Sequence, residues 1–144
     1  MYNPYESHLT EKIMSASPLE LTMMLYEAAQ GSIKKARKCL YEKDIMGRSE
    51  AVCKAMAIVA ELDSAVDETR GGELAKGLRE LYAYVLNELQ RGHILQEEKP
   101  FADAQSVLET LKEAWATCQP KTVEVSTYAS PYSGQQATRY SYAA

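Results

Sequence analysis

Helix start and stop signals constrain this chain more strictly than any other feature of its sequence. Residues 17–20 read Ser-Pro-Leu-Glu, which places a capping hydroxyl, a proline and an acidic side chain at positions N-cap, N1 and N3 of a helix. This helix is expected to extend to about Glu42. Asp44 then offers the N-cap of a second helix, which lasts to about Asp67. A connection this short predicts that the two helices are antiparallel neighbours.

Glycines and prolines mark two further helices. The Gly-Gly pair at 71–72 breaks the helical pattern, so a third helix is expected from Glu73 to Gly92, where glycine suits the position just after a helix. Pro100 opens a fourth helix that ends before Pro120. Four amphipathic helices of roughly 19–25 residues with short connections predict an all-α fold, specifically an antiparallel four-helix bundle.

The two ends of the chain differ from this middle part. Residues 119–144 contain no Leu, Ile, Met or Phe, so they can bury too little apolar surface to become ordered. Residues 1–16 contain scattered apolar side chains without helical spacing. The expected organisation is therefore a flexible N-terminal arm (1–16), a bundle (17–118) and a disordered tail (119–144).

Charge and hydropathy exclude several classes of function. The 16 Lys and Arg against 20 Asp and Glu give a net charge of −4, whereas nucleic-acid-binding proteins usually carry a basic excess. The longest apolar runs have six residues, far short of the ~20 needed to span a bilayer, and no apolar signal segment opens the chain. We therefore expect a cytoplasmic protein that neither binds nucleic acid nor inserts into a membrane. The three cysteines are odd in number and widely spaced, which predicts reduced thiols rather than a disulfide framework or a zinc site.

No arrangement of residues indicates catalysis. His8 lies in the arm, and His93 follows Gly92 in an expected connection. The sequence contains no E-x-x-H metal pattern, no P-loop, no G-x-S-x-G and no dinucleotide-binding glycine pattern. We therefore expect a protein that is not an enzyme and that has no metal, no cofactor and no small-molecule substrate.

The apolar faces of the expected helices are wider than a narrow bundle seam. They cover about 140° of the third helix and about 180° of the second, and the first half of the first helix is apolar nearly all round. One interpretation is that each helix of a bundle touches two neighbours and needs a broad stripe. The other is that the first three helices leave an exposed groove for an amphipathic helix of another protein.

Several short motifs occur in a characteristic order. They are Asn-Pro-Tyr at 3–5, Ser-Pro-Leu-Glu-Leu at 17–21, Met-Leu-Tyr-Glu at 24–27, Glu-Lys-Asp-Ile at 42–45 and Gly-Gly-Glu-Leu-Ala-Lys at 71–76, followed by Leu78, Leu81, Tyr82 and Tyr84. In this order they resemble the flagellar export chaperones of the FliS family, over residues 2–118.

The resemblance implies a specific function. Members of the family bind the disordered C-terminal segment of flagellin in a hydrophobic groove of a four-helix bundle in the cytoplasm. This binding prevents premature polymerisation and helps to deliver flagellin to the flagellar type III export gate. In the family, the N-terminal arm covers part of the groove before the substrate arrives.

The candidate partner-binding residues combine the resemblance with the apolar faces. They are Tyr5, Met23, Leu25, Tyr26, Ile33, Ile58, Leu62, Leu78, Leu81, Tyr82 and Leu86, some of which must belong to the core. Two alternatives stay open: a general helical adaptor for another amphipathic client, and a histidine phosphotransfer bundle, for which His93 beside Gly92 is poorly placed.

Overall fold

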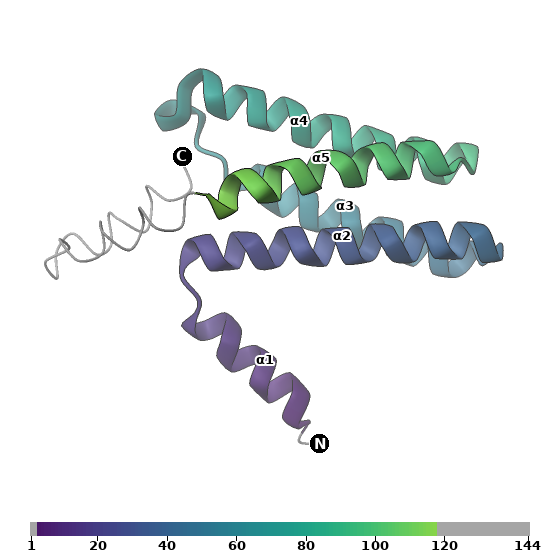
Figure 1. The fold of residues 1–144 in the computed structure, drawn as a ribbon, viewed down its shortest axis with the longest axis horizontal. Coiled ribbons are helices and arrows are strands. Elements are labelled where there is room, and N and C mark those ends of the chain that lie inside the picture. The colour runs from purple at the N-terminus through teal and green to yellow at the C-terminus, as the bar shows by residue number, and fades with distance from the viewer. Residues whose placement is uncertain (1–2, 118–144) are drawn as a thin grey trace, which may run out of the picture.

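A computed structural model describes residues 3–117 of the chain. Within that range the fold consists of five α-helices and contains no strand, which confirms the all-α class for this part of the chain (Figure 1). The helices are α1 (Pro4–Ser15), α2 (Pro18–Glu42), α3 (Ile45–Ser64), α4 (Glu68–Leu95) and α5 (Glu98–Ala116). The expected tail and Cys118 lie outside the described residues.

The starts of α2 and α3 are the ones that their capping residues predict. The Ser17 hydroxyl accepts a hydrogen bond from the Glu20 backbone N–H at 3.1 Å, and the Asp44 carboxylate accepts one from Gly47 N–H at 2.9 Å. Each bond satisfies a backbone N–H that has no partner within the first turn of its helix. The chain turns between α2 and α3 at Lys43, whose φ of 60° is left-handed.

The break predicted at Gly71-Gly72 is present as a kink, but helical structure also precedes it, and the predicted end of the third helix is too early. The helix begins at Glu68, capped by Asp67, and includes Gly72 in a non-helical conformation with φ 56° and ψ −131°. Gly72 therefore separates a short helical segment from the longer helix that continues from Glu73, because glycine adopts positive φ without a steric penalty. At the other end the helix passes through Gly92 and stops at Leu95.

Gly92 serves close packing between α4 and α5 instead of helix termination. A Cβ atom placed there would lie only 2.8 Å from the ring of Phe101, which is completely buried. The two helices therefore approach closely because this position has no side chain. The fourth predicted helix starts two residues earlier than expected, at Glu98, and Pro100 lies buried in its first turn, where proline is tolerated because no backbone hydrogen bond is lost.

The expected flexible arm is a helix, which corrects the sequence-based interpretation. In α1 the Asn3 side chain accepts a hydrogen bond from Tyr5 N–H at 3.0 Å, Pro4 occupies the first helical position, and Glu6 lies in the first turn. These are the same start signals that identified α2. Helix α1 buries no residue, and it diverges from the start of α2, away from the other helices (Figure 1).

Helices α2–α5 enclose the core. Helix α2 packs against α3 and α5, and α4 packs against the same two helices. All four contribute fully buried apolar side chains, the largest of which are Tyr26, Ile33, Val59, Tyr82, Val85, Leu89, Phe101 and Leu108.

Three aromatic side chains form a hydrogen-bonded group inside this core. The hydroxyls of Tyr26 on α2 and Tyr82 on α4 are 2.5 Å apart, and the Trp115 indole N–H on α5 donates to the Tyr26 oxygen at 2.9 Å. Burial raises the pKa of the Tyr26 hydroxyl above its ordinary value, and the pKa of Tyr82 is raised for the same reason. Both tyrosines therefore stay neutral, and the group joins three helices without a buried charge.

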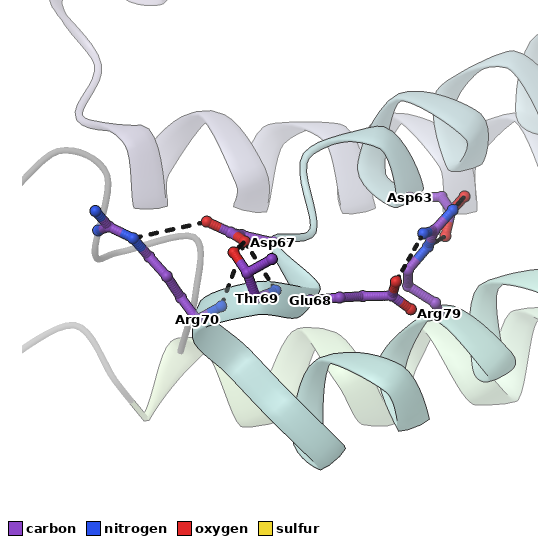
Figure 2. Close-up of polar contacts among 6 residues, drawn as sticks. All are labelled: Asp63, Asp67, Glu68, Thr69, Arg70 and Arg79. Carbon is purple, nitrogen blue, oxygen red and sulfur yellow. Dashed lines mark hydrogen bonds and ion pairs between the residues drawn. The ribbon is translucent and has the colours of Figure 1, made fainter.

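The connection between α3 and α4 is held by polar contacts (Figure 2). The Asp67 carboxylate accepts hydrogen bonds from the Thr69 hydroxyl at 2.5 Å, from Thr69 N–H at 3.1 Å and from Arg70 N–H at 3.3 Å. The bond from the Thr69 hydroxyl is the main reason that the pKa of Asp67 is lowered. Further along α4, Arg79 pairs with Asp63 at 3.1 Å and Glu68 at 3.5 Å. The end of α3 is therefore tied to the start of α4.

Candidate functional site

An apolar cleft lies between α1, α2 and α3. Its volume is about 730 Å³. It is lined by Leu9, Lys12 and Ile13 of α1, by Leu21, Thr22, Met24, Leu25, Glu27 and Ala28 of α2, and by Glu61, Leu62, Ser64 and Ala65 at the end of α3. This volume is within the range of sites that hold sizeable ligands.

The apolar walls of the cleft follow from helical spacing. On α2, Leu21, Leu25 and Ala28 are separated by four and three residues, so they share one face of the helix. On α1, Leu9 and Ile13 are one turn apart and face the cleft together. On α3, Leu62 is buried and forms part of the floor, with the small side chain of Ala65 beside it. The two sides are unequal: the α2–α3 side is packed against the core, and the α1 side is not.

The polar side chains of the cleft carry opposite charges on its two sides. Glu27 of α2 and Glu61 of α3 contribute carboxylates, and Lys12 of α1 contributes an ammonium group. Glu27 also lies 3.7 Å from Lys112 of α5, so part of its charge is balanced on the outer surface. Since all of these groups are at least partly exposed to solvent, the charges act at the rim of an otherwise apolar site.

The structure separates the eleven sequence-predicted binding residues by their burial. Tyr26, Ile33 and Tyr82 lie inside the core, fully or almost fully buried. Leu25 and Leu62 line the cleft. The half-buried ones pack against the core from outside, and these are Met23, Leu25, Ile58, Leu78 and Leu86.

Two of the predicted residues are exposed and lie outside the lining of the cleft. Leu81 on α4 is 41% exposed and Tyr5 on α1 is 74% exposed. The structure therefore brings two of the eleven residues into the cleft, and it distributes the others over the core and the surfaces of α1, α2, α3 and α4.

The sequence analysis did not predict that the α1 side of the cleft is a helix. The family resemblance places the N-terminal arm over part of the groove, with Tyr5 and Ile13 among its contacts, and Ile13 does line the cleft. The prediction did not include Leu9, because residues 1–16 were interpreted as an arm without helical spacing. The signal was present: Asn3 and Pro4 start a helix, and a helix that begins there places Leu9 and Ile13 on one face. Met24 and Ala28 on α2 were also left out of the proposed set.

The two histidines are not arranged for catalysis. His93 lies in the last turn of α4, not in a connection, and its Nδ1 accepts a hydrogen bond at 3.1 Å from Nε of Arg48, which is buried. His8 is exposed on α1. Among residues 3–117, no three His, Cys, Asp or Glu side chains are grouped so that they could hold a metal ion.

Two further features concern the described part of the chain. Cys39 is buried, Cys53 is exposed, and both are free thiols. None of the five helices combines the length and the hydropathy that crossing a bilayer requires.

Comparison with known proteins relates the chain to a family. A family model described as "Flagellar protein FliS" matches residues 1–122. The flagellar secretion chaperone FliS of Salmonella typhimurium is 33% identical over 110 residues, which cover 76% of this chain and 82% of the relative. The flagellar secretion chaperone FliS of Bacillus subtilis is 26% identical over 113 residues (78% and 84%), and that of Campylobacter jejuni is 29% identical over 111 residues (77% and 87%).

Proposed function

Since the chain belongs to the FliS family of flagellar proteins, we propose that it is a cytoplasmic export chaperone that binds the disordered C-terminal segment of flagellin. Bound flagellin would be kept from polymerising early and would be delivered to the flagellar type III export gate. The action is binding alone, without catalysis. The proposal draws support from the relatives in Salmonella typhimurium and Bacillus subtilis, which are flagellar secretion chaperones.

The observation that carries the proposal is the cleft beside a loosely packed helix. The α2–α3 side presents Leu21, Met24 and Leu25, and the helix that faces them buries no residue of its own. A client segment that folds into an amphipathic helix can cover this apolar wall. Part of the free energy gained by burial is spent on ordering the client. The resulting affinity is modest for the contact area, which suits a chaperone that must release its client.

We also propose that α2–α5 form the antiparallel four-helix bundle that the sequence predicts. Contacts between α2 and α5 run in opposite order along the two helices. Tyr26 meets Trp115, Gln30 meets Glu109 at 2.6 Å, and Arg37 meets Gln105 at 2.8 Å. In this proposal, residues 17–118 act as one rigid unit that presents the cleft, with α1 as a separable element.

The test is a titration of the full chain with a peptide that covers the C-terminal segment of the flagellin from the same organism. Calorimetry and Trp115 fluorescence follow binding, and circular dichroism follows the gain of helix. We expect saturable one-to-one binding. A scrambled peptide and an unrelated amphipathic helix are the controls, and equal binding of the unrelated helix would favour a general adaptor instead.

Two matched variants locate the site. Met24→Glu places a charge on the apolar wall of the cleft and should weaken binding about tenfold or more. Ile94→Glu places the same charge on α4 at a side chain that is 71% exposed and does not line the cleft. The affinity of this variant for the peptide should therefore stay within about twofold of the wild-type value. Wild-type affinity in a folded Met24→Glu variant would refute the cleft as the binding site.

A further inference from the structure

Helix α1 shows which kind of helix the cleft accepts. It places Leu9, Lys12 and Ile13 in the lining. These residues stand at positions i, i+3 and i+4, so an apolar pair one turn apart and one cation share the inward side of the helix. The acidic residues of α1, Glu6 and Glu11, do not line the cleft. The face that α1 turns to the cleft is therefore both apolar and basic.

The opposite wall carries the complementary charge. Glu27 and Glu61 lie on α2 and α3, and both line the cleft. Glu27 has a cationic neighbour outside the cleft in Lys112. Glu61 has no ion-pair partner within 4.0 Å among residues 3–117, and its side chain is exposed. In the proposed function a client helix takes the place of α1; Lys12 then leaves the cleft, and the wall keeps its two carboxylates.

We propose that the cleft selects amphipathic helices that carry a Lys or Arg beside an apolar i, i+4 pair, and that Glu61 is the residue that recognises this cation. The inference rests on the proposed function, because it defines which segment of a client fits the cleft. The apolar walls supply most of the affinity, and the carboxylate sets the orientation and rejects helices with an acidic residue at that position.

The contribution of one exposed charge pair is small and depends on salt. Measured pairs of this kind correspond to about a 1.5-fold to fivefold change in an equilibrium constant. Screening in concentrated salt should remove the effect, since it shortens the Debye length to about 3 Å at 1 M. A purely structural role of Glu61 would not depend on salt in this way.

The first experiment uses the full chain without any client. Lys12→Gln, Glu61→Gln and the double variant form a mutant cycle, and the readout is amide hydrogen exchange of residues 4–15. Because Lys12 and Glu61 are farther apart than 4.0 Å, we expect their coupling in exchange protection to lie at the lower end of that range, about 1.5-fold at low salt, and to vanish at 1 M salt. Glu50 is the control, because it is an exposed glutamate on the same face of α3, three turns away and outside the cleft. Lys12→Gln and Glu50→Gln should be additive, and additivity of Lys12→Gln with Glu61→Gln would overturn the proposal.

The second experiment adds the flagellin C-terminal peptide in a Lys12→Gln background. In this background α1 has no cation at position 12, so Glu61→Gln does not alter how strongly α1 competes with the peptide. A change in peptide affinity therefore reports the contact between Glu61 and the peptide alone. Adding Glu61→Gln should weaken binding about 1.5-fold to fivefold at low salt, and adding Glu50→Gln should leave it unchanged. Binding with equal affinity after Glu61→Gln would refute the selection of basic clients. If neither the wild type nor the Lys12→Gln variant binds the peptide, the proposed function is refuted instead. The mutant cycle between positions 12 and 61 uses no peptide, so it would still test the role of Glu61.

Discussion

Helices α1 and α5 begin in similar ways but end up in opposite environments. Each has a proline and a glutamate in its first turn, yet the 19 residues of α5 include five buried ones and the 12 residues of α1 include none. In α5 the buried positions Phe101, Ala104, Leu108 and Trp115 continue along one face for four turns. In α1 only Leu9 and Ile13 repeat toward the cleft.

The difference indicates that α5 contributes to the stability of the fold and that α1 contributes little to it. A stripe four turns long can fill a continuous layer of the core, and its burial contributes to the free energy of unfolding. A pair of apolar residues one turn apart covers a cleft without closing it. The interior therefore holds α2–α5 together, while α1 is weakly held; in the proposed function this leaves the cleft open to a client helix. Four variants test this division, in order of decreasing expected effect.

Phe101→Ala should have the largest effect. The ring is completely buried against Gly92, so its removal leaves a cavity between α4 and α5. We expect the free energy of unfolding to fall by about 3–5 kcal/mol in urea denaturation. Ile94→Ala, at an exposed position of α4, is the control and should change it by less than about 0.5 kcal/mol. A loss below about 1 kcal/mol for Phe101→Ala would mean that α5 does not contribute to the core as described.

Tyr26→Phe should have an intermediate effect. It removes the oxygen that accepts from the Trp115 indole and faces the Tyr82 hydroxyl, so two buried polar groups lose a partner. We expect a loss of about 1–3 kcal/mol, together with a shift of Trp115 fluorescence. Tyr84→Phe, on the exposed side of α4, should be neutral. Equal stability of the two variants would show that the hydroxyl group is not needed to join the three helices.

Asp67→Asn tests the connection that holds α3 to α4. The pKa of Asp67 is lowered in the folded chain, so its stabilisation is fully present above the ordinary carboxyl pKa and is lost as the pH falls through the lowered value. The variant should therefore melt at a lower temperature than the wild type at neutral pH, and this difference should shrink in acid. The decrease should be smaller than that caused by Tyr26→Phe, and Glu50→Gln serves as the control. A difference in melting temperature that grows in acid would contradict the assignment.

Leu9→Ala should have the smallest effect on stability. Because α1 buries no residue, the free energy of global unfolding should change by less than about 0.5 kcal/mol. Hydrogen exchange of residues 4–15 should nevertheless become faster, because one of the two apolar contacts to the cleft is lost. A global loss as large as that of Tyr26→Phe would show that α1 is part of the core and would remove the contrast with α5.

Local rules account for the parts of the fold that the sequence predicted well. Ser17 and Asp44 start helices because their side chains accept from backbone N–H groups only three residues away. Asn3 and Pro4 followed the same rule and were overlooked, so the helical state of α1 was accessible from the sequence. Gly92 was not, because a glycine near the end of a helix is equally compatible with termination and with close packing against a residue such as Phe101.

The candidate site shows where local rules stop. Leu25 and Tyr26 are adjacent and both apolar, yet Leu25 lines the cleft and Tyr26 is completely buried. Neighbouring residues on a helix point about 100° apart, so a wide apolar face contains both kinds of residue. Which of the two points inward depends on how α2 is rotated against α3 and α5.

The sequence by itself determined the helical class of the described chain, both boundaries of α2, the start of α3 and the membership in the FliS family. These properties depend on contacts within one turn of a helix and on motifs read in order. Only the tertiary structure decided that Tyr26, Tyr82 and Trp115 meet in the core, and that Leu9 and Ile13 face Leu25 across a cleft. The physical reason is that such contacts join residues on different helices, and their geometry is set by the packing of all helices together.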